Sequence, residues 1–377
     1  MKTFEFGELV ELRKEKYNPL TNDTVPCIEL EHINQNSGTI NGYVNSIEQK
    51  SIKNVFHKGD ILFAKLRPYL KKYWFAEFDG VCSSEIWVLK PKTVVTAEYL
   101  FCLIQTEEFI RIANVSFGSK MPRADWDFIN HYPFTIIHSL PEQQRIVSIL
   151  SLWDTAIAKQ TALIEKLTLR KRGLMQQLLT GKKRLKGFEG EWKEVRLGEI
   201  FDERNETNRG DLPLLSITGD RGVIYQSESD KRDISNDDKS KYKRICPNDI
   251  GYNTMRMWQG RSALSELEGI VSPAYTIVIP RDNVDVRFVA MLIQQPRVVY
   301  GFWTHSQGLV SDTLNCKYPD FCQVKVTIPS KKEQAAIADF FVEIDKEIEI
   351  QKQKLSILQE QKKGLMQVLL TGKRRVK

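Results

Sequence analysis

Cations and aromatic residues are interleaved over residues 65–74, just past the strand expected to start at the motif Gly59-Asp60-Ile61. The members are Lys65, Arg67, Tyr69, Lys71, Lys72, Tyr73 and Trp74. Lysine and arginine can pair with phosphates, and the side chains between them can reach base edges in a groove of double-stranded DNA. This stretch, which we call the Arg67 loop, therefore predicts a nucleic-acid interface. The alternative is a solvated strand end whose aromatic rings enter the core, and residue types alone leave both interpretations open.

A second group of donors occupies the matching place later in the chain, and we call it the Arg256 loop. It consists of Arg256, Trp258, Gln259 and Arg261. Arginine can donate two hydrogen bonds to guanine O6 and N7, and glutamine can pair with adenine N6 and N7. These residue types are suited to reading bases, although a solvated strand end has the same composition.

Two further loops stand before the last strand expected in each domain. They combine small residues with donors, which permits close approach to a backbone phosphate but is also typical of ordinary turns. The first contains Phe117, Gly118, Ser119, Lys120 and Arg123, and the second contains His305, Ser306, Gln307 and Gly308. From these loops we take Ser119, Lys120, Arg123, Ser306 and Gln307 as candidate contacts with DNA.

The sequence shows no catalytic or metal-binding pattern. The five histidines lack HxxxH spacing, the six cysteines form no CxxC pair, and no GxxxxGK[ST] loop occurs. An Asn or Asp followed by Pro-Pro and an aromatic residue, which an amino-methylating enzyme would use to hold a flipped base, is also missing. We therefore expect no catalytic residue, no metal and no cofactor.

Composition restricts the class of protein further. The net charge of +7 permits a polyanionic partner without proving one. The sequence contains no signal peptide and no run of 18 apolar residues. We expect a soluble cytoplasmic protein with reduced cysteines and no membrane partner.

Two long amphipathic helices with one pattern would position these loops. Alternating steps of four and three residues land on apolar side chains twice, with every position of the second set 191 residues after the first. The first set is Ile146, Leu150, Trp153, Ile157, Ile164, Leu167, Leu174 and Leu178, and the second is Ile337, Phe341, Ile344, Ile348, Leu355, Leu358, Leu365 and Leu369. Both sets are interrupted at the same steps by Gln160 and Lys171, and by Gln351 and Lys362. This heptad pattern predicts a helix-pairing seam.

Both helices begin and end alike. Ser139 with Glu142, and Ser330 with Glu333, predict capping boxes at the starts. The ends read GLMQQLLTGKKR and GLMQVLLTGKRR, in which Gly181 and Gly372 suit the left-handed C′ position. The basic residues at 182–186 and 373–377 either complement the helix C-termini, which is our preferred interpretation, or lie along phosphates.

About 40 residues give a helix of roughly 60 Å, whose apolar stripe requires a partner of equal length. We expect the two helices to pair with each other in antiparallel orientation. The alternative is that they are ordinary amphipathic helices of a globular core, although duplication at this length argues against it.

The duplication extends to the segments that precede each helix. FGELV at 6–10 recurs as LGEIF at 197–201, and GDILFAKLR at 59–67 matches NDIGYNTMR at 248–256. The segments between strands diverge, which suggests one scaffold with two different binding surfaces. We expect an α+β or mixed α/β fold in which two similar globular domains are separated by two long antiparallel coiled-coil helices, with a pseudo-two-fold internal repeat.

This organisation resembles the specificity (S) subunit of type I restriction-modification enzymes over the entire chain. The resemblance rests on PEQQRI at 141–146, KKEQAAI at 331–337, the repeated GLMQxLLTGKxR and the Gly-Asp-Ile-type strands. It implies target recognition domains at 1–138 and 185–329, and long helices at 139–184 and 330–377. The second domain departs from the family pattern at Asn248-Asp249-Ile250-Gly251, which weakens the assignment of contact residues there.

The family implies that each domain reads one half of a split site in double-stranded DNA, while the helices act as a ruler. It also implies assembly with two modification (methyltransferase) subunits and with restriction subunits that carry the ATP-dependent translocase and nuclease. The apolar residues Leu163, Leu169 and Met175 beside the seam either receive partner helices or are covered by the recognition domains. The rival hypotheses are a stand-alone DNA methyltransferase or nuclease, and a coiled-coil adaptor that binds only proteins.

Overall fold

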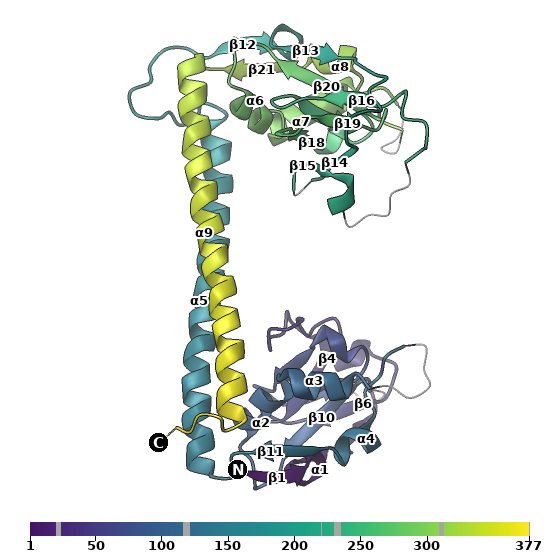
Figure 1. The fold of residues 1–377 in the computed structure, drawn as a ribbon, viewed down its shortest axis with the longest axis vertical. Helices are drawn as coiled ribbons and strands as arrows, with labels where there is room; N and C mark the ends of the chain where they lie inside the picture. Colours follow the sequence, from purple (N-terminus) through teal and green to yellow (C-terminus); the bar gives the residue numbers. More distant parts are fainter. Residues whose placement is uncertain (20–23, 116–120, 220, 230–234, 309–312, 377) are drawn as a thin grey trace. The chain divides into compact units, whose positions relative to one another are not determined.

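The computed structural model describes residues 1–19, 24–115, 121–219, 221–229, 235–308 and 313–376 (Figure 1). Contacts divide the chain into two units, each with part of both long helices. Unit 1 comprises residues 1–162 and 353–377, and unit 2 comprises residues 163–352. The mixed fold with an internal repeat is confirmed, whereas the bounds of the four predicted segments remain predictions.

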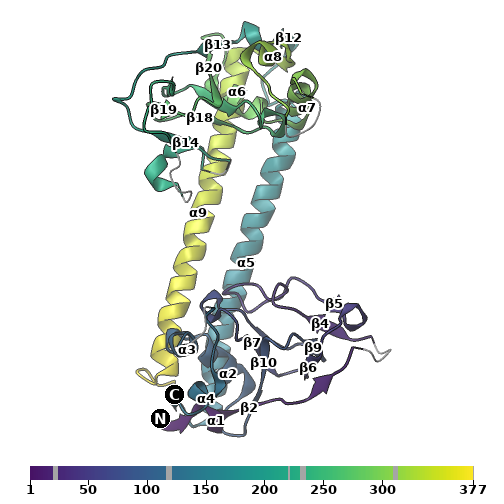
Figure 2. The same cartoon turned by 90° about the vertical axis from the view of Figure 1, so that its right-hand side faces the viewer.

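The described residues of unit 1 form three sheets. β1 (Lys2–Glu5) pairs with β11 (Pro133–Ile136), and a four-stranded sheet has the order β2 (Val10–Leu12), β10 (Ile86–Pro91), β7 (Ile61–Ala64) and β8 (Tyr73–Phe75). The third sheet has the order β3 (Lys16–Tyr17), β6 (Lys53–Phe56), β9 (Gly80–Cys82), β4 (Pro26–Ile28) and β5 (Val44–Asn45). Its helices are α1 (Phe6–Leu9), α2 (Ala97–Ile104), α3 (Glu107–Ala113) and α4 (Trp126–Asn130), with 3-10 turns η1 (Ser46–Glu48) and η2 (Pro68–Leu70) (Figure 2).

Unit 2 repeats the first two sheets. β12 (Lys193–Arg196) pairs with β21 (Lys325–Ile328), and the four-stranded sheet has the order β13 (Phe201–Arg204), β20 (Tyr275–Pro280), β17 (Ile250–Asn253) and β18 (Ser262–Leu264). Two separate pairs replace the five-stranded sheet: β14 (Leu215–Ile217) with β15 (Val223–Tyr225), and β16 (Lys243–Ile245) with β19 (Gly269–Val271). The helices are α6 (Val286–Leu292), α7 (Pro296–His305) and α8 (Tyr318–Gln323), with 3-10 turns η3 (Leu197–Glu199), η4 (Gln226–Glu228) and η5 (Met257–Gln259).

The long helices α5 (Leu140–Leu178) and α9 (Lys331–Leu370) lie side by side and run in opposite directions (Figure 1). In unit 1 the Nζ of Lys362 lies 2.5 Å from Oδ1 of Asp154, which joins the first half of α5 to the last half of α9. In unit 2 Lys171 is 2.5 Å from Asp345, which makes the equivalent contact with the roles exchanged. The predicted antiparallel pairing is confirmed. Two of the polar interruptions in the seam, Lys171 and Lys362, each form an ion pair with the other helix.

The structure buries or half-buries every apolar residue of the predicted seam. Fully buried are Ile146, Leu150, Leu178, Ile337, Phe341, Ile348 and Leu369, and half-buried are Trp153, Ile157, Ile164, Leu167, Leu174, Ile344, Leu355, Leu358 and Leu365. Most of the buried residues lie near helix ends and join the hydrophobic cores of the domains. Apart from Ile348, the middle of the seam is half-buried because two helices alone cover a stripe only in part.

The starts of the helices differ from the predicted capping boxes. The Ser330 hydroxyl accepts from the Glu333 N–H at 3.4 Å, but the Glu333 carboxylate accepts from both Nε and Nη2 of Arg184. In unit 1 the Glu142 carboxylate accepts from Arg375 at 2.7 and 2.6 Å. The glutamate half of the prediction is therefore wrong, because each glutamate binds the arginine that follows the other helix. We preferred the interpretation that the basic residues after each helix complement its C-terminus. For Arg184 and Arg375 this is wrong, because each binds the glutamate at the start of the other helix.

The predicted helix ends are confirmed by the backbone. Gly181 and Gly372 have φ of 71° and 66°, the left-handed conformation expected at C′. The Gly181 N–H donates to Leu178 O at 3.4 Å, and the Gly372 N–H donates to Leu369 O at 3.2 Å, which is the C′-to-C2 hydrogen bond of this C-terminal motif in both helices.

The glutamine of each Glu-Gln helix start joins the helix to its domain. Gln143 Oε1 accepts from the Thr96 N–H at 2.8 Å, and Gln334 Oε1 accepts from the Asp285 N–H at 3.0 Å. Both glutamines are fully buried, so these hydrogen bonds fix where α2 and α6 begin relative to α5 and α9. Within the described ranges, no helix is long and apolar enough to cross a membrane.

Candidate nucleic-acid interface

The Gly-Asp-Ile-type motif of each unit forms a tight turn that sets the start of the strand carrying the candidate loop. Gly59 and Asn248 occupy equivalent positions with φ of 90° and 71°, a conformation in which glycine and asparagine cost little. The following aspartates accept a backbone N–H from three residues earlier, Asp60 from His57 at 2.8 Å and Asp249 from Cys246 at 2.7 Å. The departure of the second motif from Gly to Asn therefore leaves the turn intact.

Each of these aspartates also binds an arginine at the end of a strand that lies two places away in the four-stranded sheet, Arg13 directly after β2 and Arg204 at the end of β13. Asp60 accepts from Arg13 at 2.8 and 3.0 Å, and Asp249 accepts from Arg204 at 2.6 and 3.1 Å. The aspartate in each pair raises the pKa of its arginine. Sequence reasoning missed both arginines, although they stand 191 positions apart, the same spacing as the helix repeat.

In unit 1 the backbone brings the Arg67 loop against the segment that contains Arg123. The Arg67 N–H donates to Pro122 O, and the Ala124 N–H donates to Lys65 O, both at 2.8 Å. Arg67 and Lys71, on either side of η2, have φ of 53° and 51°. A non-glycine residue costs roughly 1–2 kcal/mol in this left-handed region, and strain of this kind clusters at functional sites.

The side chains of the Arg67 loop differ in their freedom. Arg67 is exposed, and its one recorded side-chain contact with described residues is a 3.7 Å approach to Met121 Sδ. Lys65 is half-buried without a recorded side-chain partner in the described part of the chain, and Tyr69 is 51% exposed. Lys72 donates to Leu30 O at 2.5 Å, which directs its charge away from solvent.

Lys71 takes part in a small charged network. Its Nζ lies 2.9 Å from Glu107 Oε1, which also pairs with Lys363 of α9 at 3.0 Å. Hydrogen bonds from both lysines lower the pKa of Glu107. Lys71 is therefore tethered at the edge of the loop rather than free.

Two aromatic residues of the first candidate stretch are not available for contact. Tyr73 and Trp74 are 3% and 2% exposed and belong to β8, so the alternative interpretation, a strand end with core aromatics, is correct for both. Burial raises the pKa of the Tyr73 hydroxyl. Arg123 is half-exposed and pairs with Glu85 at 2.9 Å. Phe117, Gly118, Ser119 and Lys120 lie outside the described residues.

In unit 2 the Arg256 loop contains η5, and Gly260, which follows η5, has a φ of 73°. Arg256, Gln259 and Arg261 are exposed, and their side chains have no recorded hydrogen bond or ion pair with the residues that the structure describes. Trp258 is half-buried and donates its Nε1–H to Met255 O at 3.0 Å.

The second candidate loop of unit 2 lies next to the first. The Cys316 N–H donates to Thr254 O at 2.9 Å, and Asn315 pairs with Gln307 through both backbone groups. The Gln307 side chain donates to Asp320 at 3.2 Å, and the Ser306 hydroxyl donates to Phe302 O at 2.7 Å. In both units the structure thus brings together the two loops that the sequence singled out.

The chemistry offered by these surfaces is hydrogen-bond donation by arginine, lysine and glutamine. Over the described ranges, no group of three histidine, cysteine or acidic residues is arranged to hold a metal ion. Burial raises the pKa of Cys27, Cys102 and Cys316 to about 12, so these thiols are protonated and unreactive at neutral pH.

Comparison with known proteins identifies relatives that share this architecture. A family model described as the type I restriction modification DNA specificity domain matches the chain twice, over residues 1–169 and 189–360. The putative MjaX specificity subunit of Methanocaldococcus jannaschii is 26% identical over 370 residues, covering 89% of this chain and 83% of that protein. The MjaVIII specificity subunit of the same organism is 25% identical over 327 residues, covering 79% and 75%. The EcoDI specificity subunit of Escherichia coli matches at 28% over 145 residues, which is 38% of this chain and 32% of that protein.

Solved structures share the fold. A chain solved in work on complex assembly and conformational transition of the type I R-M system aligns with a TM-score of 0.63 at 18% identity, covering 98% of this chain and 97% of that one. The S subunit of the type I restriction-modification system from M. genitalium aligns with a TM-score of 0.54 at 14% identity, covering 98% and 96%. Since the two family matches together span most of its length, this chain belongs to the family of type I restriction-modification DNA specificity subunits.

Proposed function

We propose that this chain reads a bipartite double-stranded DNA site, with residues 1–138 contacting one half and residues 185–329 the other. The observation that carries the proposal is that one duplicated frame presents two different exposed donor loops, Arg67 in one and Arg256 with Arg261 in the other. Different donors on equivalent strands would give different half-sites, because base identity is read by such side chains.

The paired helices would set the distance between the two half-sites, as dimer geometry sets half-site spacing in readers of palindromes. The duplicated ion pairs Asp154 with Lys362 and Asp345 with Lys171 support a fixed helix register. Deleting one heptad from both helices, about 10 Å of helix, should change the permitted spacer and leave the half-sites unchanged. A spacer that stays the same would contradict the ruler role.

The proposed partners are two modification subunits and the restriction subunits, with no catalytic residue, metal or cofactor contributed by this chain. We infer a cytoplasmic complex. Leu163 and Leu169 on α5 are 41% and 69% exposed, and exposed leucines beside a paired helix can receive a partner helix. Met175, the third candidate for such a contact, is half-buried and packs against the core of unit 2.

The decisive experiment maps methylated adenines in DNA modified by the complex reconstituted with its modification subunits. Arg67→Ala should weaken recognition at one half-site and Arg256→Ala at the other, each by about 1–3 kcal/mol if the contact is to a base. Lys90→Ala, which removes an exposed cation on β10 of the first domain, is the control and should change neither half-site. Unchanged methylation at both half-sites in both arginine variants would remove these residues from the interface.

The rival functions predict different results. A stand-alone enzyme would transfer labelled methyl groups from S-adenosylmethionine, or cut DNA with Mg²⁺, as the purified chain alone. A protein-only adaptor would leave the assembled complex without a steep dependence of DNA affinity on salt concentration.

A further inference from the structure

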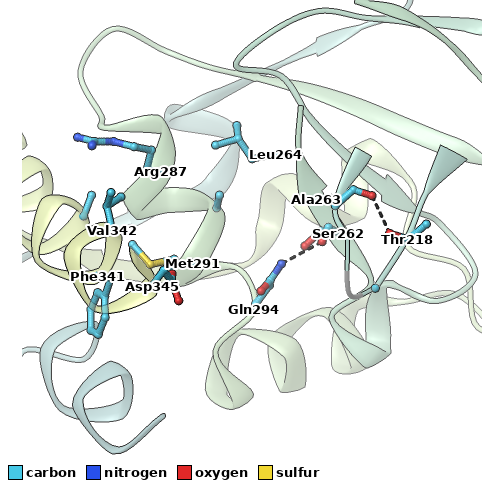
Figure 3. Close-up of a pocket in the computed structure, with 14 residues that line it drawn as sticks. Thr218, Ser262, Ala263, Leu264, Arg287, Met291, Gln294, Phe341, Val342 and Asp345 are labelled. Atoms are coloured by element: carbon cyan, nitrogen blue, oxygen red, sulfur yellow. Dashed lines mark hydrogen bonds between the residues drawn. The ribbon is translucent and has the colours of Figure 1, made fainter. Parts of the chain in front are cut away.

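A hollow of about 290 Å³ lies in unit 2 between β18, α6 and α9 (Figure 3). Its wall is mostly apolar and includes Leu264, Ala290, Met291, Phe341 and Val342. The rim carries the polar side chains of Arg287, Gln294 and Asp345. A concave, mostly apolar site with a few polar groups is the usual form of a small binding site.

The internal repeat shows which part of unit 1 corresponds to this hollow. Strand β8 pairs with β7 in the same register as β18 with β17, so that Tyr73 is equivalent to Ser262 and Phe75 to Leu264. Both pairs are 189 positions apart, and the caps of α2 and α6, Thr96 and Asp285, keep that spacing. On the same spacing, Phe101 of α2 is equivalent to Ala290 of α6.

Unit 1 fills the equivalent place with its own aromatic rings. The rings of Tyr73 and Phe101 lie 5.9 Å apart at 82°, and those of Phe75 and Phe101 lie 5.7 Å apart at 65°. Edge-to-face packing of this kind is favourable. Unit 2 has serine, leucine and alanine at these positions and therefore lacks all three rings of the cluster.

The charged groups at the rim are already paired within the chain. Arg287 pairs with Asp285 at 3.0 Å and with Asp339 at 2.7 Å. Asp345 pairs with Lys171 at 2.5 Å, and Gln294 donates to Ser262 O at 2.9 Å. A bound group therefore needs no charge of its own, and an ionised ligand would have to compete with existing ion pairs.

We propose that this hollow is a binding site for a neutral aromatic ring, which replaces the rings that unit 2 lacks. The ring belongs either to a free small molecule or to an aromatic side chain of a modification subunit, the second source resting on the function proposed above. In both cases the ring packs against Ala290, Leu264 and Phe341. This is the place equivalent to the one where the Phe101 ring packs against Tyr73 and Phe75 in unit 1. Dispersion contacts between the ring and these apolar side chains supply the attraction.

Indole is the probe, and the full-length chain is titrated while the ligand is observed by saturation-transfer NMR. Wild type should show saturable binding. Ala290→Phe, which restores the residue found in unit 1, should weaken indole binding at least about tenfold without lowering the melting temperature. Leu264→Phe is a second filling variant that decides the result if Ala290→Phe fails to fold.

A matched control comes from the other unit. Phe101→Ala should open the equivalent hollow in unit 1, lower the melting temperature and raise the indole stoichiometry from one to two. No saturable binding by wild type, or equal binding by wild type and a folded filling variant, would overturn the proposal.

The source of the ring is decided by the affinity of the chain for its modification subunit. A loss of about tenfold or more in Ala290→Phe, together with lost indole binding, assigns the ring to a protein side chain. Unchanged assembly together with lost indole binding assigns it to a small molecule.

Discussion

The Arg67 loop and the Arg256 loop follow equivalent strands, β7 and β17, yet each keeps its shape by different means. In unit 1 two non-glycine residues, Arg67 and Lys71, hold the left-handed conformation, and Lys71 is tethered to Glu107. In unit 2 the left-handed position is taken by Gly260, and Arg256 and Arg261 have no recorded tether in the described part of the chain. The Arg67 loop therefore has a strained backbone and an ion pair that holds one of its side chains. The Arg256 loop has its left-handed conformation at a glycine, and its two arginines extend without such an ion pair among the described residues.

The strands and helix starts that carry these loops, which we call the frame, are alike in the two units, because their contacts recur almost atom for atom. The aspartate-arginine pairs of Asp60 and Asp249, and the helix-start glutamines Gln143 and Gln334, make the same hydrogen bonds in both units. These repeated contacts are structural. The units differ in the donors of their exposed loops, in the five-stranded sheet that only unit 1 forms among the described residues, and in the ring cluster of Tyr73, Phe75 and Phe101. The following variants test this division, starting with the frame.

Removing the aspartate of the duplicated turn should have the largest effect on stability. Asp60 and Asp249 are 4% and 2% exposed, and each accepts both an arginine and a backbone N–H. Asp60→Ala and Asp249→Ala should each lower the free energy of unfolding by about 3–5 kcal/mol, because each leaves a partly buried arginine without its partner.

Urea denaturation of the two variants provides the measurement. Similar losses would support a shared frame. If one aspartate costs less than about 1 kcal/mol while the other costs several, the two turns are not equivalent in energy.

The helix-start glutamate of unit 1 should show a pH-dependent contribution. Hydrogen bonds from Arg375, together with the Val376 N–H, lower the pKa of the buried Glu142 carboxyl. A carboxyl whose folded pKa is below its unfolded value of about 4.3 stabilises the fold above that pH and loses the contribution as the pH falls through the folded pKa.

Glu142→Gln should therefore cost about 1–2 kcal/mol at pH 7, a value reduced because Arg375 is half-exposed. Urea denaturation from pH 7 down to pH 3 should show the difference from wild type shrinking below about pH 4. A difference that stays constant with pH would contradict the assigned role of the ionised carboxylate. Glu333→Gln is the matched variant at pH 7 in unit 2.

The seam was predictable from sequence because its information is local. Steps of four and three residues, repeated at an interval of 191, identify Ile146 and Ile337 as equivalent, and the glycines Gly181 and Gly372 mark the ends. Equal lengths and matched polar steps suit either direction, so the antiparallel prediction rested on an approximate two-fold axis relating the segments before the two helices. Lys171 and Lys362 were recognised as interruptions, but their partners Asp345 and Asp154 could not be assigned before the helices were placed together.

The errors came from contacts between residues far apart in the chain. Capping-box spacing predicted that Glu142 binds the start of its own helix, but Arg375, 233 residues later, provides two charged donors and is the stronger partner. Tyr73 and Trp74 were grouped with the exposed cations because alternation along a strand does not show which layers cover its two faces. In the Arg67 loop, Arg67 and Tyr69 are exposed as the residue types suggested, whereas Lys72 turns toward Leu30 O.

Reversing one charge of the seam should have a smaller effect than the buried aspartates. Asp154→Lys replaces the partner of Lys362 by a second cation, which removes an attraction and adds a repulsion. The expected loss is about 1–2 kcal/mol, because Asp154 is more than half exposed. Adding Lys362→Asp should restore most of that stability in a double-mutant cycle, and the untouched Lys171–Asp345 pair serves as the internal control. An additive double variant would mean that the pair contributes nothing to the helix register.

The same new residue should have different costs in the two loops, and these are the smallest effects we expect. Gly260→Ala places a Cβ at a φ of 73° and within 3.0 Å of Val299 Cγ2, so it should lose about 1 kcal/mol. Lys71→Ala keeps a non-glycine residue at a φ of 51°, where wild type already bears the conformational cost. Only its surface ion pair with Glu107 is lost, which corresponds to about 0.5 kcal/mol or less. Urea denaturation of both variants measures the two losses in the free energy of unfolding. If Lys71→Ala loses as much as Gly260→Ala, the ion pair with Glu107 contributes more to the stability of the Arg67 loop than a surface ion pair should.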